Sequence, residues 1–410
     1  HAADIHLDSP LCGLARYEGA PIGQAQNATR RAFINLVDLA CQESIDFVLL
    51  VGDLYDVDWK DYNTGLFFNQ QMSRLREADI SVFIVRGNHD AGNSITRQLC
   101  LPDNVTELSI HSPETKVLEH LGVAIHGQGF ADKVTTENLA SHYPKHVNGY
   151  YNIGLLHTSL NGREGHATYA PCTVSELLSL DYDYWALGHI HKSEVLYQKP
   201  YIVFPGNLQG RHVRETGAKG CVVVEVTDKK TVLTHQALDV LRWEVCQLEV
   251  SDITYPEEMI DKSRWAVAQA LQNANGRPLA LRFNIQGICP IHAELHRHSE
   301  RWINEIRAAT TDAGSGHVWV EKIQLNTQTL PITQLQEAGP LGELVDTLRI
   351  LPQDNSMLQD LMAEFHFLKH ALPLEVRFNE KGRSIDLENP DTIKYLLNNV
   401  KEMLLAKLLA

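Results

Sequence analysis

The sequence FVLLVGDLYD, residues 47–56, places Asp53 and Asp56 directly after a run of five apolar residues. A run this short and this apolar is typical of a β-strand that is covered on both faces. Helical patterns near 29–41 and 62–78 flank the run on either side. Because short apolar strands alternate in this way with helices over the first ~235 residues, the sequence predicts a layered α/β fold.

Polar residues also come directly after three later apolar runs. VFIVR leads into Asn88 and His89, IGLL leads into His157, and WAL leads into the motif GHIH with His189 and His191. The carboxyl ends of strands are where open α/β sheets build their sites. We therefore expect these residues to converge at one edge of the fold.

A further pair, Asp4-x-His6, has the same spacing as His189-x-His191. Side chains two positions apart on a strand face the same way, so we expect the two side chains of each pair to face the same side. Phosphodiester cleavage needs a nucleophile that is strong at neutral pH and relief of negative charge on the phosphate. Two divalent metals about 3.5–4 Å apart supply both, with a carboxylate as bridge and imidazole or carboxamide groups as further ligands. Each motif alone is weak, but together and in this order they predict a two-metal phosphoesterase site.

The ordered motifs D-x-H, GD-x-x-D, GNHD, H and GH-x-H resemble those of the calcineurin-like metallophosphoesterases. Within that superfamily the chain is most similar to the SbcD-type DNA repair exonucleases, and among these to YhaO-like proteins. The similarity rests on the stretches ADIHLDSPLCGL, VGDLYD, VRGNHDA, LLHTSL, YWALGHIHK and PGNLQGRHVRETGAKG. The resemblance implies a four-layer α/β/β/α sandwich with a small α+β capping domain and a C-terminal helical segment.

The resemblance also implies roles for individual residues. One metal would be held by Asp4, His6, Asp53 and His191. The other metal would be held by Asp53, Asn88, His157 and His189, so that Asp53 is the bridge. His89 would face the scissile phosphate and stabilise the transition state or protonate the leaving oxygen, and Asp56 would orient His89. Kinship favours Mn²⁺ as the metal, although mixed nitrogen and oxygen ligands also suit iron, zinc or magnesium.

The segment GRHVRE contains three basic residues, Arg211, His212 and Arg214, after an apolar strand-like run. One interpretation is a solvated loop, and the other is a rim that contacts phosphate. We name these three as candidate substrate-binding residues and leave both interpretations open. Asp90, in contrast, is expected to cap a turn rather than to act in the chemistry.

Changes of pattern along the chain predict four parts. Residues 1–240 form the metallophosphoesterase nuclease domain, and 241–328 read as a small capping domain for DNA recognition with a helix near 293–308. Residues 329–340 (TLPITQLQEAGP) read as a linker, and 341–410 read as a helical region, which the resemblance implies binds an ATPase partner. The chain begins with His1 rather than Met, so we expect an apolar strand-like stretch to precede it.

The last part carries an apolar stripe at helical spacing. Its members are Ile393, Leu396, Leu397, Val400, Leu404 and Leu408. Such a stripe is usually core, but on a small appended segment it can also be a partner surface. The resemblance implies the second use, as a docking site for an SbcC-like coiled-coil ATPase.

Composition limits the setting of the protein. The net charge of −15 argues against a generic electrostatic DNA binder, because phosphate binding needs a positive face that metals, a local patch or a partner would then supply. The seven cysteines are scattered without a C-x-x-C pair, which indicates reduced thiols in a cytoplasmic protein. No apolar run is long enough for a membrane helix, which needs roughly 18 residues or more.

The motifs favour a metal-dependent nuclease, and the resemblance implies a Mn-dependent DNA exonuclease, with single-strand endonuclease action as a further activity. The resemblance implies a homodimeric nuclease subunit of an SbcCD-like repair or defence complex. The alternative is a phosphodiesterase or phosphatase acting on a small molecule such as a nucleotide. A third hypothesis, a non-catalytic adaptor with the same fold, is disfavoured because every ligand position and His89 match the family pattern.

Overall fold

The computed structural model describes residues 1–9, 11, 27–56, 62–92, 100–161, 169–228 and 230–328, and isolated positions after 346. The predicted linker 329–340 lies outside the described residues, as does nearly all of the predicted helical region 341–410. The chain divides into two compact units. The first comprises His1–Val245, Ala270–Leu281 and His317–Glu321, and the second comprises Cys246–Gln269, Arg282–Gly316 and Lys322–Ala410. Among the described residues, no helix has the length and apolarity needed to cross a membrane.

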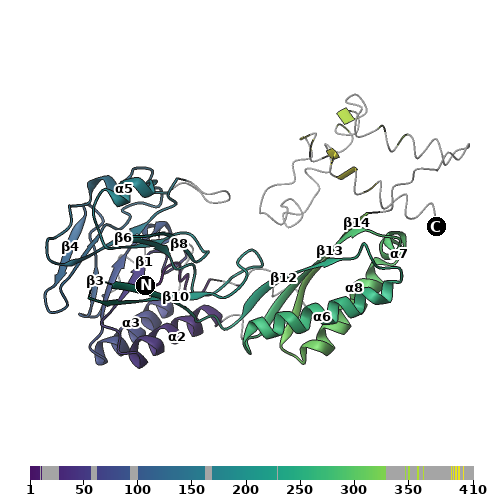
Figure 1. Cartoon of the computed structure of the whole chain (residues 1–410), viewed down its shortest axis with the longest axis horizontal. Coiled ribbons are helices and arrows are strands. Elements are labelled where there is room, and N and C mark those ends of the chain that lie inside the picture. The colour runs from purple at the N-terminus through teal and green to yellow at the C-terminus, as the bar shows by residue number, and fades with distance from the viewer. Residues whose placement is uncertain are drawn as a thin grey trace, which may run out of the picture. The chain divides into compact units, whose positions relative to one another are not determined.

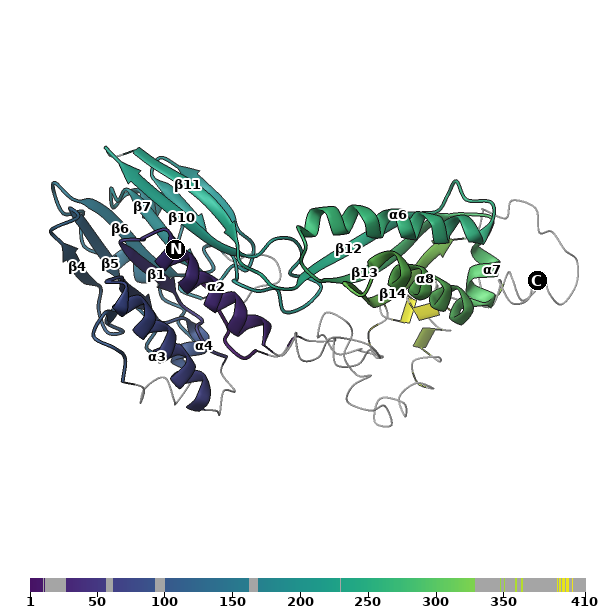
Figure 2. The same ribbon diagram turned by 90° about the horizontal axis from the view of Figure 1, so that it is seen from below.

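A parallel sheet in the order β1-β2-β3 forms one inner layer of the first unit. Its strands are β1 (Phe47–Val51), β2 (Ser81–Val85) and β3 (Val105–Glu107). Two amphipathic helices, α2 (Ala28–Gln42) and α3 (Tyr62–Glu77), cover its outer face (Figure 2). The apolar runs and helical patterns in the sequence therefore predicted β1, β2, α2 and α3 to within a residue or two, but not β3.

A six-stranded sheet in the order β4-β5-β6-β7-β9-β8 forms the second inner layer. Its strands are β4 (Glu114–Leu118), β5 (Val123–Gly127), β6 (Tyr151–His157), β7 (Tyr184–Gly188), β8 (Glu194–Gln198) and β9 (Tyr201–Phe204). The inner four strands pair in parallel, while β4 and β8 pair antiparallel at the edges. The two edge strands lack an apolar run because they are largely solvent-facing, which is why the sequence reading missed them.

The two sheets pack face to face through a shared apolar core. This core joins Leu49, Val51, Phe83 and Val85 of the first sheet to Ile125, Ile153, Leu155, Ala186 and Val203 of the second. Beyond the second sheet lies a thin helical layer, α5 (Val174–Leu178) and the 3-10 helix η2 (Leu139–His142), packed on Trp185 and Leu187. The layers follow the order α/β/β/α that the resemblance implies. A hairpin of β10 (Gly220–Thr227) and β11 (Lys230–Ala237) completes the first unit (Figure 1).

A separate three-stranded sheet has the order β12-β13-β14, with β12 (Arg242–Glu249), β13 (Leu279–Ile288) and β14 (Val318–Gln328). Helices α6 (Pro256–Ala274), α7 (His292–Arg297) and α8 (Ser299–Gly314) alternate with these strands, so this part is α+β as expected. The prediction of one helix over 293–308 was wrong. The helix breaks at His298, whose backbone angles of φ −115° and ψ 38° are not helical, and α7 and α8 result.

Candidate metal centre

Five chain segments bring the predicted metal ligands to one place, where parallel strands end. Asp53 follows β1, and Asn88 opens the short helix α4 (Asn88–Ala91) after β2. His157 is the last residue of β6, and His189 follows β7 directly. The start of the chain runs beside β1, where Ala2 bridges Leu50, and brings in Asp4 and His6.

The backbone at this place is unusual. Asp4, His6, Asp53 and His189 all have positive φ, at 51°, 46°, 53° and 102°. Residues with a side chain rarely adopt this region, and such strain persists only where the surrounding structure enforces it. Strain of this kind clusters at functional sites, and here it occurs at four of the seven predicted ligands.

Hydrogen bonds between the segments enforce the conformation. The backbone nitrogen of His189 donates to both carboxylate oxygens of Asp4, at 3.1 and 3.0 Å. In the same way the backbone nitrogen of His89 donates to Oδ1 of Asp53 at 2.9 Å. Each carboxylate is thus fixed by the backbone of a different ligand loop.

Asp90 joins the GNHD loop to the GDLYD loop. Its Oδ1 accepts from the backbone nitrogens of Leu54 and Tyr55 at 2.9 and 3.1 Å, and its Oδ2 accepts from Gly87 at 3.0 Å. Because these bonds use both oxygens of a buried carboxylate, Asp90 braces the loops that carry Asp53 and His89. This is a structural role, as the sequence interpretation favoured.

Two glycines allow the loops to approach. A Cβ atom on Gly188 would overlap the carbonyl oxygen of Val51, and one on Gly87 would overlap Oδ1 of Asp53. Glycine before the ligand is therefore a requirement of packing.

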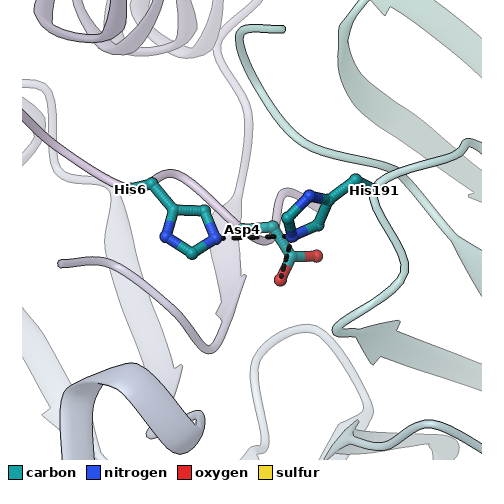
Figure 3. A group of neighbouring side chains, drawn as sticks. All are labelled: Asp4, His6 and His191. Carbon is teal, nitrogen blue, oxygen red and sulfur yellow. Dashed lines mark hydrogen bonds and ion pairs between the residues drawn. The ribbon is translucent and has the colours of Figure 1, made fainter. Parts of the chain in front are cut away.

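The predicted ligands form two of the three groups of described side chains that are each small enough for one cation, the third being His6 with Asp56 and His89. In the first, potential ligand atoms of Asp4, His6 and His191 all lie within 4.8 Å of one another (Figure 3). In the second, those of Asp53, His157 and His189 do so as well. Asn88 joins the second group, because its Oδ1 lies 3.1 Å from Nε2 of His157.

Asp53 lies between the two groups. Its Oδ2 is 3.5 Å from Nε2 of His157 and 3.9 Å from Nε2 of His6. A single carboxylate within reach of both groups is what a bridging ligand requires.

The donor set fits divalent cations. Three of the histidines have their Nδ1 atoms occupied: His6 by Asp56 at 2.6 Å, His191 by Glu215 at 2.7 Å, and His157 by the carbonyl oxygen of Val51 at 3.0 Å. With Nδ1–H donated outward, each Nε2 carries a lone pair that faces the site. The Nε2 atoms of His6 and His191 lie 3.4 Å apart, so two such lone pairs point toward each other (Figure 3). A cation near both nitrogens would offset the repulsion between the two lone pairs.

The electrostatic surroundings of His6 and His157 shift the pKa values of the two histidines in opposite directions. Burial and the charge of Arg211 lower the pKa of His6 to about 4, so His6 is neutral at pH 7. Burial also opposes the charged form of His157, but the charge and hydrogen bond of Asp53 outweigh it and raise the pKa of His157 to about 9. In the metal-free protein, Asp53 therefore holds a proton on His157 where a cation would otherwise sit.

His89 differs from the buried ligands, since its side chain is 33% exposed. Its Nδ1 lies 3.3 Å from Oδ1 of Asp56. Burial lowers the pKa of His89, but the hydrogen bond to Asp56 and the charges of Asp53 and Asp56 outweigh it and raise that pKa above its usual value. The pair can present a protonated imidazole at the opening of the site.

The three basic candidates of GRHVRE take different positions. Arg211 is largely buried, with Nη1 3.6 Å from Asp56 and Nη2 3.4 Å from Glu215. Nε2 of His212 also lies 3.5 Å from Glu215, whereas Arg214 is exposed. Their predicted role in substrate binding stays a prediction.

Glu215 is the residue that the sequence reading missed. It is buried, accepts from His191, and also accepts from the backbone nitrogen of Arg211 at 2.7 Å and from Nδ2 of Asn207 at 2.9 Å. The one available signal was an acidic residue within a segment that is otherwise basic.

Comparisons with known proteins agree with this geometry. The family model for calcineurin-like phosphoesterases matches residues 1–193, and that for the middle domain of the metallophosphoesterase YhaO matches 243–328. An uncharacterized metallophosphoesterase YhaO of Bacillus subtilis is 34% identical over 300 residues, which cover 71% of this chain and 72% of that protein. Two layered sheets with these paired ligand groups define a metal-dependent phosphoester hydrolase. The chain belongs to the calcineurin-like metallophosphoesterase family and is YhaO-like within it.

More distant relatives are also found. The DNA double-strand break repair protein Mre11 of Sulfurisphaera tokodaii is 25% identical over 202 residues, covering 48% of this chain and 49% of that protein. Mre11 of Saccharolobus solfataricus is 28% identical over 204 residues, covering 47% and 48%. A solved dimetal phosphatase from Danio rerio covers 58% of this chain and 95% of its own at 10% identity and a TM-score of 0.38, a likeness too low to argue from.

Proposed function

We propose that this chain is a Mn-dependent DNA exonuclease with a two-metal centre, and that it also cuts single-stranded DNA internally. The observation that carries phosphodiester hydrolysis is the pair His89 and Asp56 at the opening of the two ligand groups. A partly exposed imidazole with a raised pKa, 3.3 Å from a carboxylate, is suited to give a proton to a leaving oxygen.

Each residue then has a definite task. Asp4, His6, Asp53 and His191 would hold one cation, and Asp53, Asn88, His157 and His189 the other. When bound, the cations supply Lewis acidity that strengthens a water nucleophile and offsets charge on the phosphate. Asp56 holds Nδ1 of His89, so that Nε2–H of His89 is directed to the 3′ oxygen of the leaving group. The proton moves from Nε2 to that oxygen as the P–O bond breaks.

Two points support DNA over a small substrate. The distant relatives that align with this chain are named as DNA double-strand break repair proteins. The chain also continues well beyond the metal centre, through the domain at 243–328 and the region 341–410, and a small-molecule enzyme needs neither. We propose that the first selects DNA.

The wider assembly is part of the same proposal. The helices of 341–410 would dock on an SbcC-like coiled-coil ATPase, and two copies of the chain would form a homodimer in the cytoplasm. Copurification of the full chain with the product of a neighbouring ATPase gene tests the first point. Sedimentation of the full chain alone tests the second.

The net charge of −15 favours the alternative, a phosphodiesterase for a small nucleotide, because such a substrate needs no extended positive face. A direct comparison decides between the two. End-labelled duplex DNA and cyclic and linear nucleotides are incubated with the full chain and Mn²⁺, with Asp53→Asn as the inactive control. We expect progressive shortening of the duplex, and hydrolysis confined to the small nucleotides would reject the nuclease.

A further inference from the structure

Two carboxylates outside the ligand groups orient ligand histidines. Asp56 accepts from Nδ1 of His6 at 2.6 Å, and Glu215 accepts from Nδ1 of His191 at 2.7 Å. The two histidines belong to the same ligand group, although the two carboxylates come from segments far apart in the chain. The direction of both Nε2 lone pairs therefore depends on where Asp56 and Glu215 are held.

Arg211 lies between these carboxylates. Its Nη1 is 3.6 Å from Oδ1 of Asp56, and its Nη2 is 3.4 Å from Oε1 of Glu215. Nη1 also donates to the hydroxyl of Ser9 at 3.3 Å. The Arg211 side chain is only 14% exposed, so it packs within the structure rather than lying as a solvated cation at the surface.

The backbone strengthens one side of this arrangement. The backbone nitrogen of Arg211 donates to Oε2 of Glu215 at 2.7 Å, and Nδ2 of Asn207 donates to the same oxygen at 2.9 Å. Lys219 donates from Nζ to the carbonyl oxygen of His191 at 2.8 Å. The segment from Asn207 to Lys219 thus holds His191 by its ring and by its backbone.

The shape of the guanidinium explains why Arg211 suits this position better than a lysine would. A planar fork can place different nitrogens against two carboxylates at once, whereas an ammonium is a single compact charge on a flexible stem. Glu215 is buried and Asp56 is partly buried, and such carboxylates require a nearby positive charge because an unpaired buried charge is strongly destabilising. Because both Nη atoms face these carboxylates and Nε is buried, little of the guanidinium is presented to a phosphate.

We propose that Arg211 is a positioning residue that aligns His6 and His191 through Asp56 and Glu215, and that it does not bind the substrate phosphate. The inference rests on the two-metal centre of the proposed function but not on DNA as the substrate.

Calorimetric titration of Mn²⁺ into the metal-free full chain tests the inference without any turnover. Arg211→Gln is expected to weaken Mn²⁺ binding roughly 10–100-fold, the usual effect of losing an outer partner of a ligand histidine. The KM for bis(p-nitrophenyl) phosphate is expected to stay unchanged at saturating Mn²⁺. The matched control is Arg76→Gln, which removes a half-exposed arginine paired with Asp103 and should leave Mn²⁺ binding as in the wild type.

Arg211→Lys decides the question if Arg211→Gln does not fold. Lysine keeps the charge but cannot span both carboxylates, so we expect Mn²⁺ binding to stay weakened. Wild-type Mn²⁺ affinity in either folded variant, together with a raised KM, would overturn the inference, because that is the behaviour of a phosphate contact. A wild-type chain that binds Mn²⁺ but does not degrade DNA would end the nuclease proposal alone and leave this test intact.

Discussion

The Nε2 atoms of His6 and His191 lie 3.4 Å apart and face each other, while their Nδ1 atoms are held from outside by carboxylates. Two imidazoles fixed in this way cannot turn to relieve the opposition of their lone pairs. The arrangement is stable when a positive charge lies near both nitrogens. The fold and the metal are therefore expected to be thermodynamically coupled.

Adding Mn²⁺ to the metal-free chain should raise its melting temperature. A ligand at about 100 times its Kd stabilises the native state by about 2.7 kcal/mol at one site. His191→Ala removes one ligand of the first group and should reduce the Mn²⁺-dependent increase without abolishing it, because the second group remains. Scanning calorimetry with and without Mn²⁺ measures both effects. His120→Ala, at an exposed turn, is the matched control and should show the full increase.

Binding of Mn²⁺ should strengthen as pH rises toward about 9. Burial and Asp53 together leave the pKa of His157 at about 9 in the metal-free protein, so a cation has to displace a proton from this ring at lower pH. This one group contributes up to about tenfold in affinity per pH unit between its ordinary pKa of about 6.5 and 9. Calorimetry in buffers of different ionisation enthalpy measures the proton release. Equal affinity at pH 7 and pH 9 would contradict the prediction.

The raised pKa of His157 has the opposite effect on the stability of the metal-free protein, which falls as pH rises. The pKa of His157 is raised on folding, so its contribution to stability is complete below about pH 6.5 and is lost as pH rises through 9. Urea unfolding of the metal-free chain should therefore show a decrease in stability from pH 6.5 to pH 9 that Mn²⁺ reverses.

Gly188→Ala should be among the most damaging single-methyl changes in the chain. The added Cβ would overlap the carbonyl oxygen of Val51 and crowd Nδ1 of His157, and backbone cannot rotate away as a side chain can. We expect a loss of more than 2 kcal/mol in the free energy of unfolding, within the range of severe overpacking. Gly122→Ala is the control: its Cβ would meet no atom within 4 Å, so only the left-handed backbone strain of about 1–2 kcal/mol applies.

The sequence allowed most strands, and the convergence of most candidate ligands, to be predicted for one physical reason. A strand covered on both faces must be almost wholly apolar, so β1, β2, β6 and β7 stand out, and the polar residues after them lie at a common edge. The edge strands β4 and β8 lack that signal because their residues are partly exposed to solvent and need not be apolar.

Other features depend on contacts that no local pattern records. The hydrogen bond of Glu215 with His191 joins two loops that follow different strands, and Arg211 looks in the sequence like any solvated cation. The positive φ of His6 is uncommon for a residue with a side chain, and contacts with distant segments hold it there. Such outer supports become visible only when the fold brings distant segments together.

His89→Ala should abolish most hydrolysis of DNA while Mn²⁺ binding is retained. Removal of a general acid costs about 10²–10⁴-fold, and His89 is in neither the group Asp4, His6 and His191 nor the group Asp53, His157 and His189. The leaving group provides a sharper test. An alkoxide such as the 3′ oxygen of DNA needs a proton, whereas p-nitrophenolate leaves readily without one. The variant should therefore lose far less activity on bis(p-nitrophenyl) phosphate than on DNA. Since the pKa of His89 is raised above its usual value, the wild type should lose kcat on DNA at alkaline pH, and this limb of the profile should be missing from the variant. Equal losses on both substrates would mean that His89 acts on the phosphate charge rather than on the leaving oxygen.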